Sequence, residues 1–377
     1  MTPLLRQAAA VLLATAVMHA HAAPRDITPA HDSQVIEILP ERVSMAASTP
    51  PAAVQAARQW IKLARQNADP RYLGRAQAVL ARWWGREDAP AGVAVLQATI
   101  EQSRHEFDAA RRTLERALRR EPAQAQGWLT LATLERVAGR YEAAAAACQQ
   151  VARYGATLHA QACLLESRSL QGQHEQARRG LDALIRAAGD APTRAWLLSL
   201  QAESEERAGR DDSAAAAYQA SLALDADGYT ALALADLWLR RSRPEAALAA
   251  LNRQPPGDAV LLRRARAWQQ LGDGRWHQLA AQLRERFAAL DERGDDPGLH
   301  GRERALALLW LENKPRQAWP LAQGNLMLQK EPLDWWLALQ SAQDGARAQD
   351  LAELVQALAR AGLQDARLAR WQPGGTK

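Results

Sequence analysis

Apolar positions along most of the chain recur at helical spacing and do not alternate as they do in strands. From about residue 52 the pattern is helix, short turn, helix, and no stretch has the β-branched and aromatic content of a strand. Alanine runs such as Ala143 to Ala147 favour helix, because alanine has the highest helix propensity. Thr49, followed by Pro50 and Pro51, is typical of a helix start. The pattern predicts an all-α protein.

An internal repeat with a period of about 34 residues organises these helices. Five similar turns each end at an alanine, and these alanines are Ala110, Ala144, Ala177, Ala214 and Ala247. Successive alanines of this series lie about 33 to 37 residues apart, which is the length of a helix-pair repeat. Repeats of this length form helix pairs that bury their apolar faces only against neighbouring pairs. The period therefore predicts a stack of helix pairs.

The repeat units resemble tetratricopeptide repeats. Trp128 and the following Leu-Thr-Leu-Ala match the first helix of that repeat, Gly139 to Tyr141 match the turn, and Ala144 stands at the close-packing position. The whole chain is also similar to exported tetratricopeptide proteins of proteobacteria. The resemblance implies an all-α, right-handed α-α superhelix of about nine helix pairs, with a role in binding and not in catalysis.

The repeats divide the chain into six expected parts. Terminal units of a stack shield its ends, so a capping pair is expected on each side of the repeats. The parts are a signal peptide (1–22), an extended N-terminal tail (23–50), an N-terminal capping helix pair (51–90), tetratricopeptide-like repeats (91–257), diverged repeats (258–332) and C-terminal capping helices (333–377).

The first 22 residues have the features of a secretory signal peptide. Arg6 provides the positive start, an apolar run extends from Ala8 to Met18, and the segment 20–22 reads Ala-His-Ala, a small-x-small cleavage pattern. We therefore expect a periplasmic or secreted protein. No later apolar run is long enough to predict a transmembrane segment.

Charge and motifs exclude several classes of function. The formal net charge is +5, and it becomes +4 once Arg6 is removed with the signal peptide; basic and acidic residues alternate, so no nucleic-acid partner is expected. No phosphate loop, nucleophile elbow or dinucleotide fingerprint is present. His105 and His174 are each followed by Glu, but Ala109 and Arg178 stand where a zinc helix needs a second His. We expect no enzyme activity, no cofactor and no metal.

Cys148 and Cys163 are the only cysteines, an even number in a chain expected to be exported. The repeat alignment places them on adjacent antiparallel helices, where the two thiols could meet. A candidate disulfide would close a 15-residue loop. The alternative is that both are buried thiols acting as small apolar side chains.

The first helix of each repeat is expected to line the concave face, where proteins of this kind bind ligands. The carboxylates of this face make its middle acidic, which suits a basic peptide or protein. The alternative is a solvated polar face that Arg207 and Arg240 neutralise. The candidate groove residues are Thr99, Gln102, Arg136, Glu166, Glu203, Glu206, Asp236 and Arg240.

Two functions follow from this reading. The first is a non-catalytic periplasmic scaffold that binds another protein or a peptide, for instance in envelope assembly. The second is a ligand- or glycan-binding accessory subunit of an envelope enzyme complex that uses exposed tryptophans. Most of the 13 tryptophans fall at core positions, but in Trp83-Trp84 and Trp335-Trp336 adjacent helical residues point about 100° apart, so one ring of each pair should reach a surface.

Overall fold

Helices follow one another along the whole described chain in this computed structural model, which describes residues 49–292 and 300–372. These residues contain eighteen α-helices and two 3-10 helices, and no strand occurs among them. They belong to one unit, Met45–Lys377. The expected signal peptide and all but the last two residues of the expected tail lie outside the described residues.

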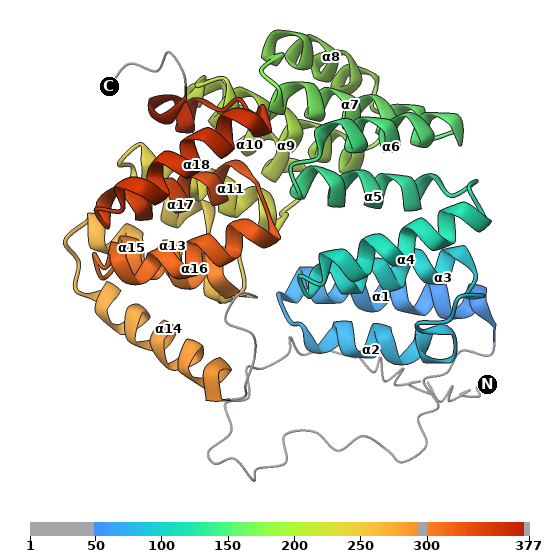
Figure 1. The fold of residues 1–377 in the computed structure, drawn as a ribbon, viewed down its shortest axis with the longest axis horizontal. Helices are drawn as coiled ribbons and strands as arrows, with labels where there is room; N and C mark the ends of the chain where they lie inside the picture. The colour runs from blue at the N-terminus through green and yellow to red at the C-terminus, as the bar shows by residue number, and fades with distance from the viewer. Residues whose placement is uncertain (1–48, 293–299, 373–377) are drawn as a thin grey trace, which may run out of the picture. The chain divides into compact units, whose positions relative to one another are not determined.

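The α-helices form nine consecutive pairs within the described ranges, so the fold is an all-α superhelix of helix pairs (Figure 1). The first five pairs are α1 (Pro50–Asn67) with α2 (Arg71–Leu80), α3 (Ala91–Ser103) with α4 (Phe107–Arg120), α5 (Ala125–Val137) with α6 (Tyr141–Arg153), α7 (Thr157–Leu170) with α8 (His174–Ala187), and α9 (Ala191–Arg207) with α10 (Asp211–Leu224). The other four are α11 (Gly228–Arg240) with α12 (Pro244–Ala250), α13 (Asp258–Gln270) with α14 (Arg275–Glu292), α15 (Gly301–Trp310) with α16 (Pro315–Leu328), and α17 (Pro332–Asp344) with α18 (Ala348–Ala361). The 3-10 helices are η1 (Ala81–Trp83) and η3 (Ala366–Trp371).

The residues that define the repeat also explain why the helices pair. The five turn alanines named above are all fully buried, because each lies where the second helix of a pair crosses the first and only a small side chain fits. Gly139, Gly172 and Gly209 end three of the first helices with φ values of 73°, 85° and 74°, a left-handed conformation that glycine adopts without strain. The repeat pattern therefore sets both the turn and the helix crossing.

Apolar side chains form successive clusters along the stack, each shared by neighbouring pairs. The second helices, such as α4 and α8, bury one stripe and expose charged residues on the other side. The first helices are buried on more sides and carry buried polar residues as well, including Ser169, Ser204 and Glu206. Among helices of the described residues, none is long and apolar enough to cross a membrane.

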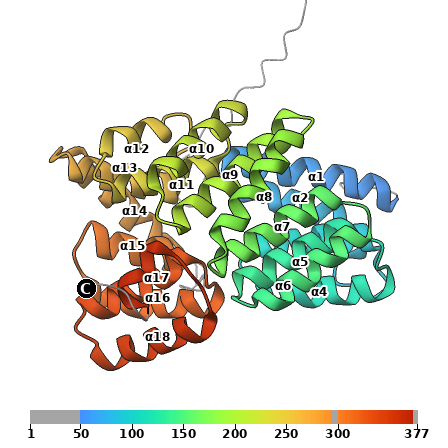
Figure 2. The ribbon, with the colours of Figure 1, turned by 90° about the horizontal axis from the view of Figure 1, so that it is seen from above.

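The C-terminal part of the chain returns to the middle of the stack, where Figures 1 and 2 show the red helices beside α9. The backbone N–H of Lys330 donates to the carbonyl of Val137 at 2.7 Å, and that of Gln364 donates to the carbonyl of Leu170 at 2.8 Å. Val137 and Leu170 are the last residues of α5 and α7. No N–H group of the same helix donates to the carbonyls of these two residues, so they are available to other donors. We call residues 329–331 and 363–367 the closing segments.

The closing segments lie directly against the turns of the middle repeats. A β-carbon at Gly172 would lie 3.0 Å from Cγ of Gln364, and one at Gly209 would lie 3.1 Å from Cβ of Ala366. Arg367 forms an ion pair with Glu206 of α9 at 3.2 Å. Residues 363–367, expected only to cap the last repeat, therefore also contact two repeats in the middle of the stack, and Lys330, expected in a diverged repeat, contacts a third.

Candidate functional site

A cavity of about 1220 Å³ lies on the inner side of the helix pairs. Its wall comes from the first helices of successive pairs, α3 through α13, and from the C-terminal helices with the closing segments. All eight residues of the candidate groove line it: Thr99, Gln102, Arg136, Glu166, Glu203, Glu206, Asp236 and Arg240. The structure thus brings the positions taken from the repeat alignment to one concave site.

Three carboxylates of this wall occupy the same position in consecutive repeats. Glu166, Glu203 and Asp236 lie on α7, α9 and α11, and the steps between them equal those between the last three turn alanines. We call these three residues the carboxylate row. Because equivalent positions of a repeat face the same way, the row points into the cavity as a set.

Each member of the carboxylate row pairs with an arginine. Arg136 of α5 lies 3.0 Å from Glu166, and Arg207 lies 3.3 Å from Glu203 on the same helix. In the third pair, Arg263 of α13 holds Asp236 at 2.8 Å through a two-pronged contact. Two of the three pairs join successive first helices, so they tie the wall together as well as neutralising it.

Glu206 is surrounded more completely. It forms ion pairs with Arg240 at 2.6 Å and with Arg367 of the closing segments at 3.2 Å, and it accepts a hydrogen bond from the Tyr218 hydroxyl at 3.1 Å. Its side chain is only 4% exposed. The sequence predicts a solvent-facing position for Glu206 on the concave surface; in the structure this carboxylate is buried and already paired. The repeat alignment identified Arg207 and Arg240 as neutralising residues because both lie in the aligned repeats. Arg263 and Arg367 were not predicted, because they lie in later parts of the chain.

The charge of the cavity wall is close to balanced, with nine Lys or Arg and eight Asp or Glu among the lining residues. Burial raises the pKa of Glu203 to about 7, an effect that Arg207 only partly offsets. The carboxylate of Glu203 in turn holds the pKa of Tyr229 well above its usual value. Protonation of Glu203 near neutral pH would therefore change the charge of the cavity by one unit.

Aromatic side chains form a second row in the wall. His159, Trp196 and Tyr229 line the cavity from α7, α9 and α11, and the steps between them are the same as in the carboxylate row. The rings of His159 and Trp196 stack with centroids 5.2 Å apart. We call these three residues the aromatic row. This row was not predicted from the sequence, although each of its members stands seven residues before a member of the carboxylate row.

The adjacent tryptophan pairs differ from each other. Trp335 is buried in the C-terminal cluster, while Trp336 lines the cavity beside Trp310 with centroids 6.5 Å apart. Trp83 and Trp84 are both half-buried against the first apolar cluster and do not line the cavity. Of the four rings, Trp336 is the one that reaches the candidate site.

Cys148 of α6 and Cys163 of α7 are joined by a disulfide in the structure, with their Cα atoms 5.8 Å apart. Cys163 also lines the cavity, so the bond fixes one of the wall helices to the outer helix of the preceding pair. Among the described residues, no group of three or more His, Cys, Asp or Glu side chains is arranged to hold a metal ion.

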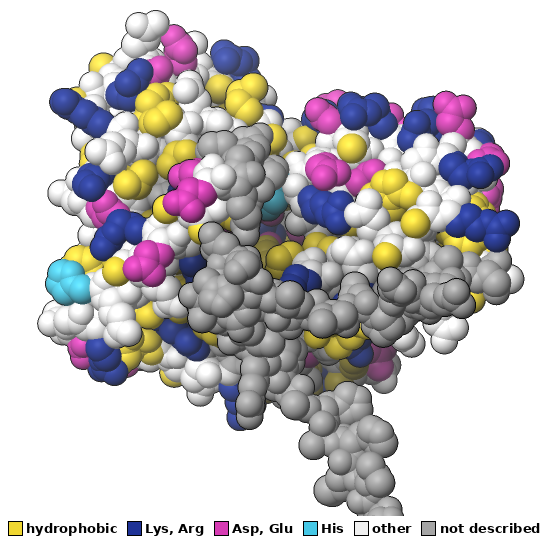
Figure 3. Space-filling model, turned by 90° about the horizontal axis from the view of Figure 1, so that it is seen from below, with side chains coloured by type: hydrophobic (Ala, Val, Ile, Leu, Met, Phe, Trp, Pro, Cys, Tyr) yellow, Lys and Arg dark blue, Asp and Glu magenta, His cyan; other side chains and the backbone are white. Residues whose placement is uncertain are grey.

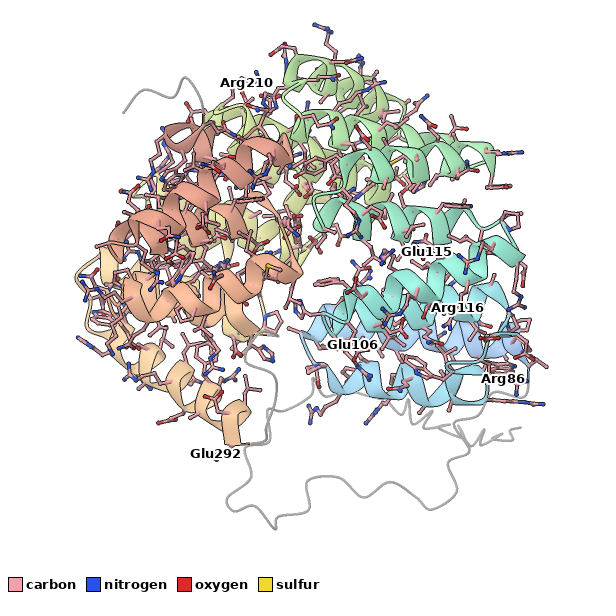
Figure 4. All side chains as sticks on the ribbon, in the orientation of Figure 1. Arg86, Glu106, Glu115, Arg116, Arg210 and Glu292 are labelled. Carbon is pink, nitrogen blue, oxygen red and sulfur yellow. A yellow bond between two sulfur atoms is a disulfide. The ribbon has the colours of Figure 1, made fainter. Side chains whose placement is uncertain are left out.

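The outer surface of the molecule has no predominant charge. On the face shown in Figure 3, basic and acidic side chains are interspersed and neither kind gathers into one large block. Arg210, which Figure 4 places at the turn between α9 and α10, illustrates this, because it pairs with both Glu205 and Glu175. Charge on the outer turns is thus matched between neighbouring repeats, as it is inside the cavity.

Comparison with known proteins shows the fold. No protein-family model and no curated protein sequence matches the chain. The solved structure of a Rap protein complexed with competence and sporulation factor is 12% identical, with a TM-score of 0.51, and the match covers 82% of this chain and 86% of that one. PilF of Pseudomonas aeruginosa is 18% identical over 53% of this chain and 92% of its own, with a TM-score of 0.37. A tetratricopeptide repeat protein of Parabacteroides merdae is 12% identical over 76% and 99%, with a TM-score of 0.31. The chain therefore has the helical-repeat fold of tetratricopeptide proteins.

Proposed function

We propose that this protein is a non-catalytic periplasmic scaffold that binds a peptide or an extended segment of another protein in its inner cavity. The observation that carries the proposal is the cavity itself, whose wall presents equivalent side chains from consecutive first helices. A wall that repeats in this way suits a ligand that also repeats along its length, and a polypeptide is such a ligand.

The size of the cavity supports a peptide over a small molecule. Pockets for small ligands and cofactors usually have volumes of roughly 300–1000 Å³. The cavity, at about 1220 Å³, exceeds that range. The comparison with the Rap protein supports the same proposal at the level of fold, since that structure is a complex with a factor bound to a helical-repeat protein.

The charges of the cavity favour a partner of low net charge. A basic partner, which the sequence analysis expected, would have to displace arginines that already pair with Glu166, Glu203, Glu206 and Asp236. Removing one partner of a buried ion pair is unfavourable, because the remaining charge stays in a low-dielectric site. We therefore place less weight on net positive charge than on the shape and apolar content of the partner.

The periplasmic location and a role in envelope assembly rest on the signal-peptide features of residues 1–22. A second candidate function is a glycan-binding accessory subunit of an envelope enzyme complex. The aromatic row favours it, because exposed aromatic rings in a cavity can stack on sugars as well as on side chains.

Site-specific photo-crosslinking in intact cells tests the proposed function. A benzophenone amino acid replaces Thr133, which lines the cavity, and in a control variant it replaces Arg119, which is exposed on the outer helix α4. We expect discrete protein adducts from position 133 and not from position 119. Equal labelling from both positions, or adducts from position 119 alone, would move the binding surface away from the cavity.

A further inference from the structure

The aromatic row has a regular place in the repeat. His159, Trp196 and Tyr229 lie in the N-terminal parts of α7, α9 and α11, each seven residues before a member of the carboxylate row. Seven helical residues make two turns, so the backbone positions of the two rows run parallel across the wall about 10 Å apart. The backbone positions of the aromatic row are therefore distinct from those of the carboxylate row, although the Tyr229 hydroxyl donates a hydrogen bond to the Glu203 carboxylate.

Tyr229 is a strongly exposed member of the row. Its side chain is 57% exposed, and it is the one strongly exposed large apolar residue of the described chain that lines the cavity. The apolar clusters of the neighbouring helix pairs do not cover this ring. Exposed apolar surface inside a concavity is typical of a surface that a partner covers.

Neighbouring contacts hold the row in position. Trp196 is stacked on His159, and the hydroxyl of Thr230, next to Tyr229, donates to the Ser199 hydroxyl of α9 at 3.1 Å. The N-terminal parts of α9 and α11 are therefore adjacent at the level of the aromatic row. The three rings sit on rigid helices, so a partner would not have to order them on binding.

We propose that the aromatic row selects the partner by binding apolar or aromatic side chains that recur at about every third residue of an extended peptide. This inference rests on the proposed function, because it assigns a specificity to the same cavity. Packed helices lie about 8–10 Å apart. A polyproline II segment advances about 3.1 Å per residue and brings every third side chain to the same face, a repeat of about 9 Å. Such a peptide, crossing α7, α9 and α11, would place one side chain near each ring.

The carboxylate row then stabilises the packing of the wall helices and does not bind the partner. Its members already pair with arginines, and two of these pairs hold neighbouring helices at a fixed spacing while the aromatic row contacts the peptide. Burial of aromatic rings supplies much of the binding energy at protein interfaces, and truncation of such a residue commonly weakens affinity by tenfold or more. Binding at this row should accordingly depend little on salt.

Peptide selection tests the inference. Phage displaying random dodecapeptides are selected on the immobilised mature protein, and in parallel on the Trp196→Ala/Tyr229→Ala variant. The expected result is enrichment, on the wild type alone, of sequences with apolar or aromatic residues three positions apart. Enrichment of sequences without that spacing, or equal enrichment on both proteins, would overturn the inference and leave the proposed function standing. No enrichment on the wild type would remove the proposed function itself.

A second measurement guards against misfolding of the double variant. Fluorescence anisotropy with one enriched peptide compares the wild type, Tyr229→Ala, Tyr229→Phe and the control Tyr154→Ala, whose ring lies outside the cavity lining. Tyr229→Ala should weaken binding about tenfold or more, because the ring is exposed and its loss should spare the fold. Tyr229→Phe and Tyr154→Ala should bind like the wild type. If oligosaccharides bind in place of the peptide and lose affinity with Tyr229→Ala, the row selects glycans and the inference fails.

Discussion

Residues 91–251 and the described residues of the C-terminal part (258–292 and 300–372) both fold as helix pairs, yet they contribute to the cavity in different ways. The first region repeats, so its turn alanines, its carboxylate row and its aromatic row all recur at the same steps. The second region keeps the helix pairs but not the step, and its closing segments cross to the middle of the stack. The repeated sequence produces a regular wall. Where the repeat is lost, the C-terminal end of the chain packs against the middle of the stack and encloses the cavity.

The polar contacts of the two regions differ in the same sense. In the regular region, Glu166 and Glu203 each form an ion pair with one arginine of that region, Arg136 and Arg207. In the C-terminal region, Asp334 accepts four hydrogen bonds: two from Arg302, one from Asn325 and one from the backbone of Glu331. One fully buried carboxylate therefore fixes α15, α16 and α17 together, and its removal should affect far more than one contact.

The largest effect is expected for Asp334→Ala. Among the described residues, the change leaves Arg302 with only its ion pair to Glu331 and removes the acceptor of Asn325 and of the Glu331 backbone N–H; loss of a buried charged partner lowers stability by about 3–5 kcal/mol. Urea unfolding followed by the helical circular-dichroism signal measures it. The control is Asp344→Ala at the end of the same helix, where the carboxylate is exposed and, among the described residues, accepts a hydrogen bond from Gln340 alone. We expect a change of about 0.5 kcal/mol or less there. Similar losses from both variants would contradict a special role for Asp334.

Reduction of the Cys148–Cys163 bond tests the regular region. A bridge closing a 15-residue loop stabilises by about 3 kcal/mol in the chain-entropy model, so reduced protein should melt at a lower temperature. Thiol counting on the denatured, unreduced protein should find no free thiol. Two free thiols in protein purified from an oxidising compartment would show that the cysteines act only as small apolar side chains.

The Glu203→Gln variant tests the wall through pH. The pKa of Glu203 is raised to about 7 by burial, so between its ordinary value of 4.5 and pH 7 the folded state binds more protons than the unfolded state. The stability of the wild type should therefore fall as pH rises through that window, and the contribution of the Glu203 carboxyl to the fall should be about 3 kcal/mol. In the Gln variant this contribution disappears. Parallel pH profiles for the two proteins would mean that Glu203 titrates normally.

The smallest difference between a variant and its control is expected for Gly172→Ala, which probes the contact between the two regions. The glycine has φ 85°, and a β-carbon there would crowd Gln364 of the closing segments. Gly155→Ala is the matched control, since its φ is 93° but nothing lies within 4 Å of the added atom. Both variants suffer backbone strain of about 1–2 kcal/mol, and Gly172→Ala should lose about 1 kcal/mol more. Equal losses of unfolding free energy in the two variants would show that the closing segments do not restrict the side chain at position 172.

These contrasts also show what the sequence could predict. Repetition allowed the concave positions to be aligned, because a step of about 33 to 37 residues fixes which side chains share a face. Arg207 and Arg240 could be recognised as neutralising charges, since they belong to the aligned units. Arg367 could not, because no local pattern relates a C-terminal residue to a helix in the middle of the stack. Tyr229 was missed for another reason, as an aromatic residue in a repeat is ordinarily a core residue.

The closing segments also affect the order in which the parts of the protein can fold. Lys330 and Gln364 bond to Val137 and Leu170, residues far earlier in the sequence, whereas contacts inside the repeats join near neighbours. Local contacts form fast, and distant ones require a long loop to close first. The helix pairs of the wall can therefore form as the chain emerges, but the cavity cannot be enclosed until the last helices and the closing segments are present. A chain shortened by a late stop codon would keep its repeats and lose the enclosed site.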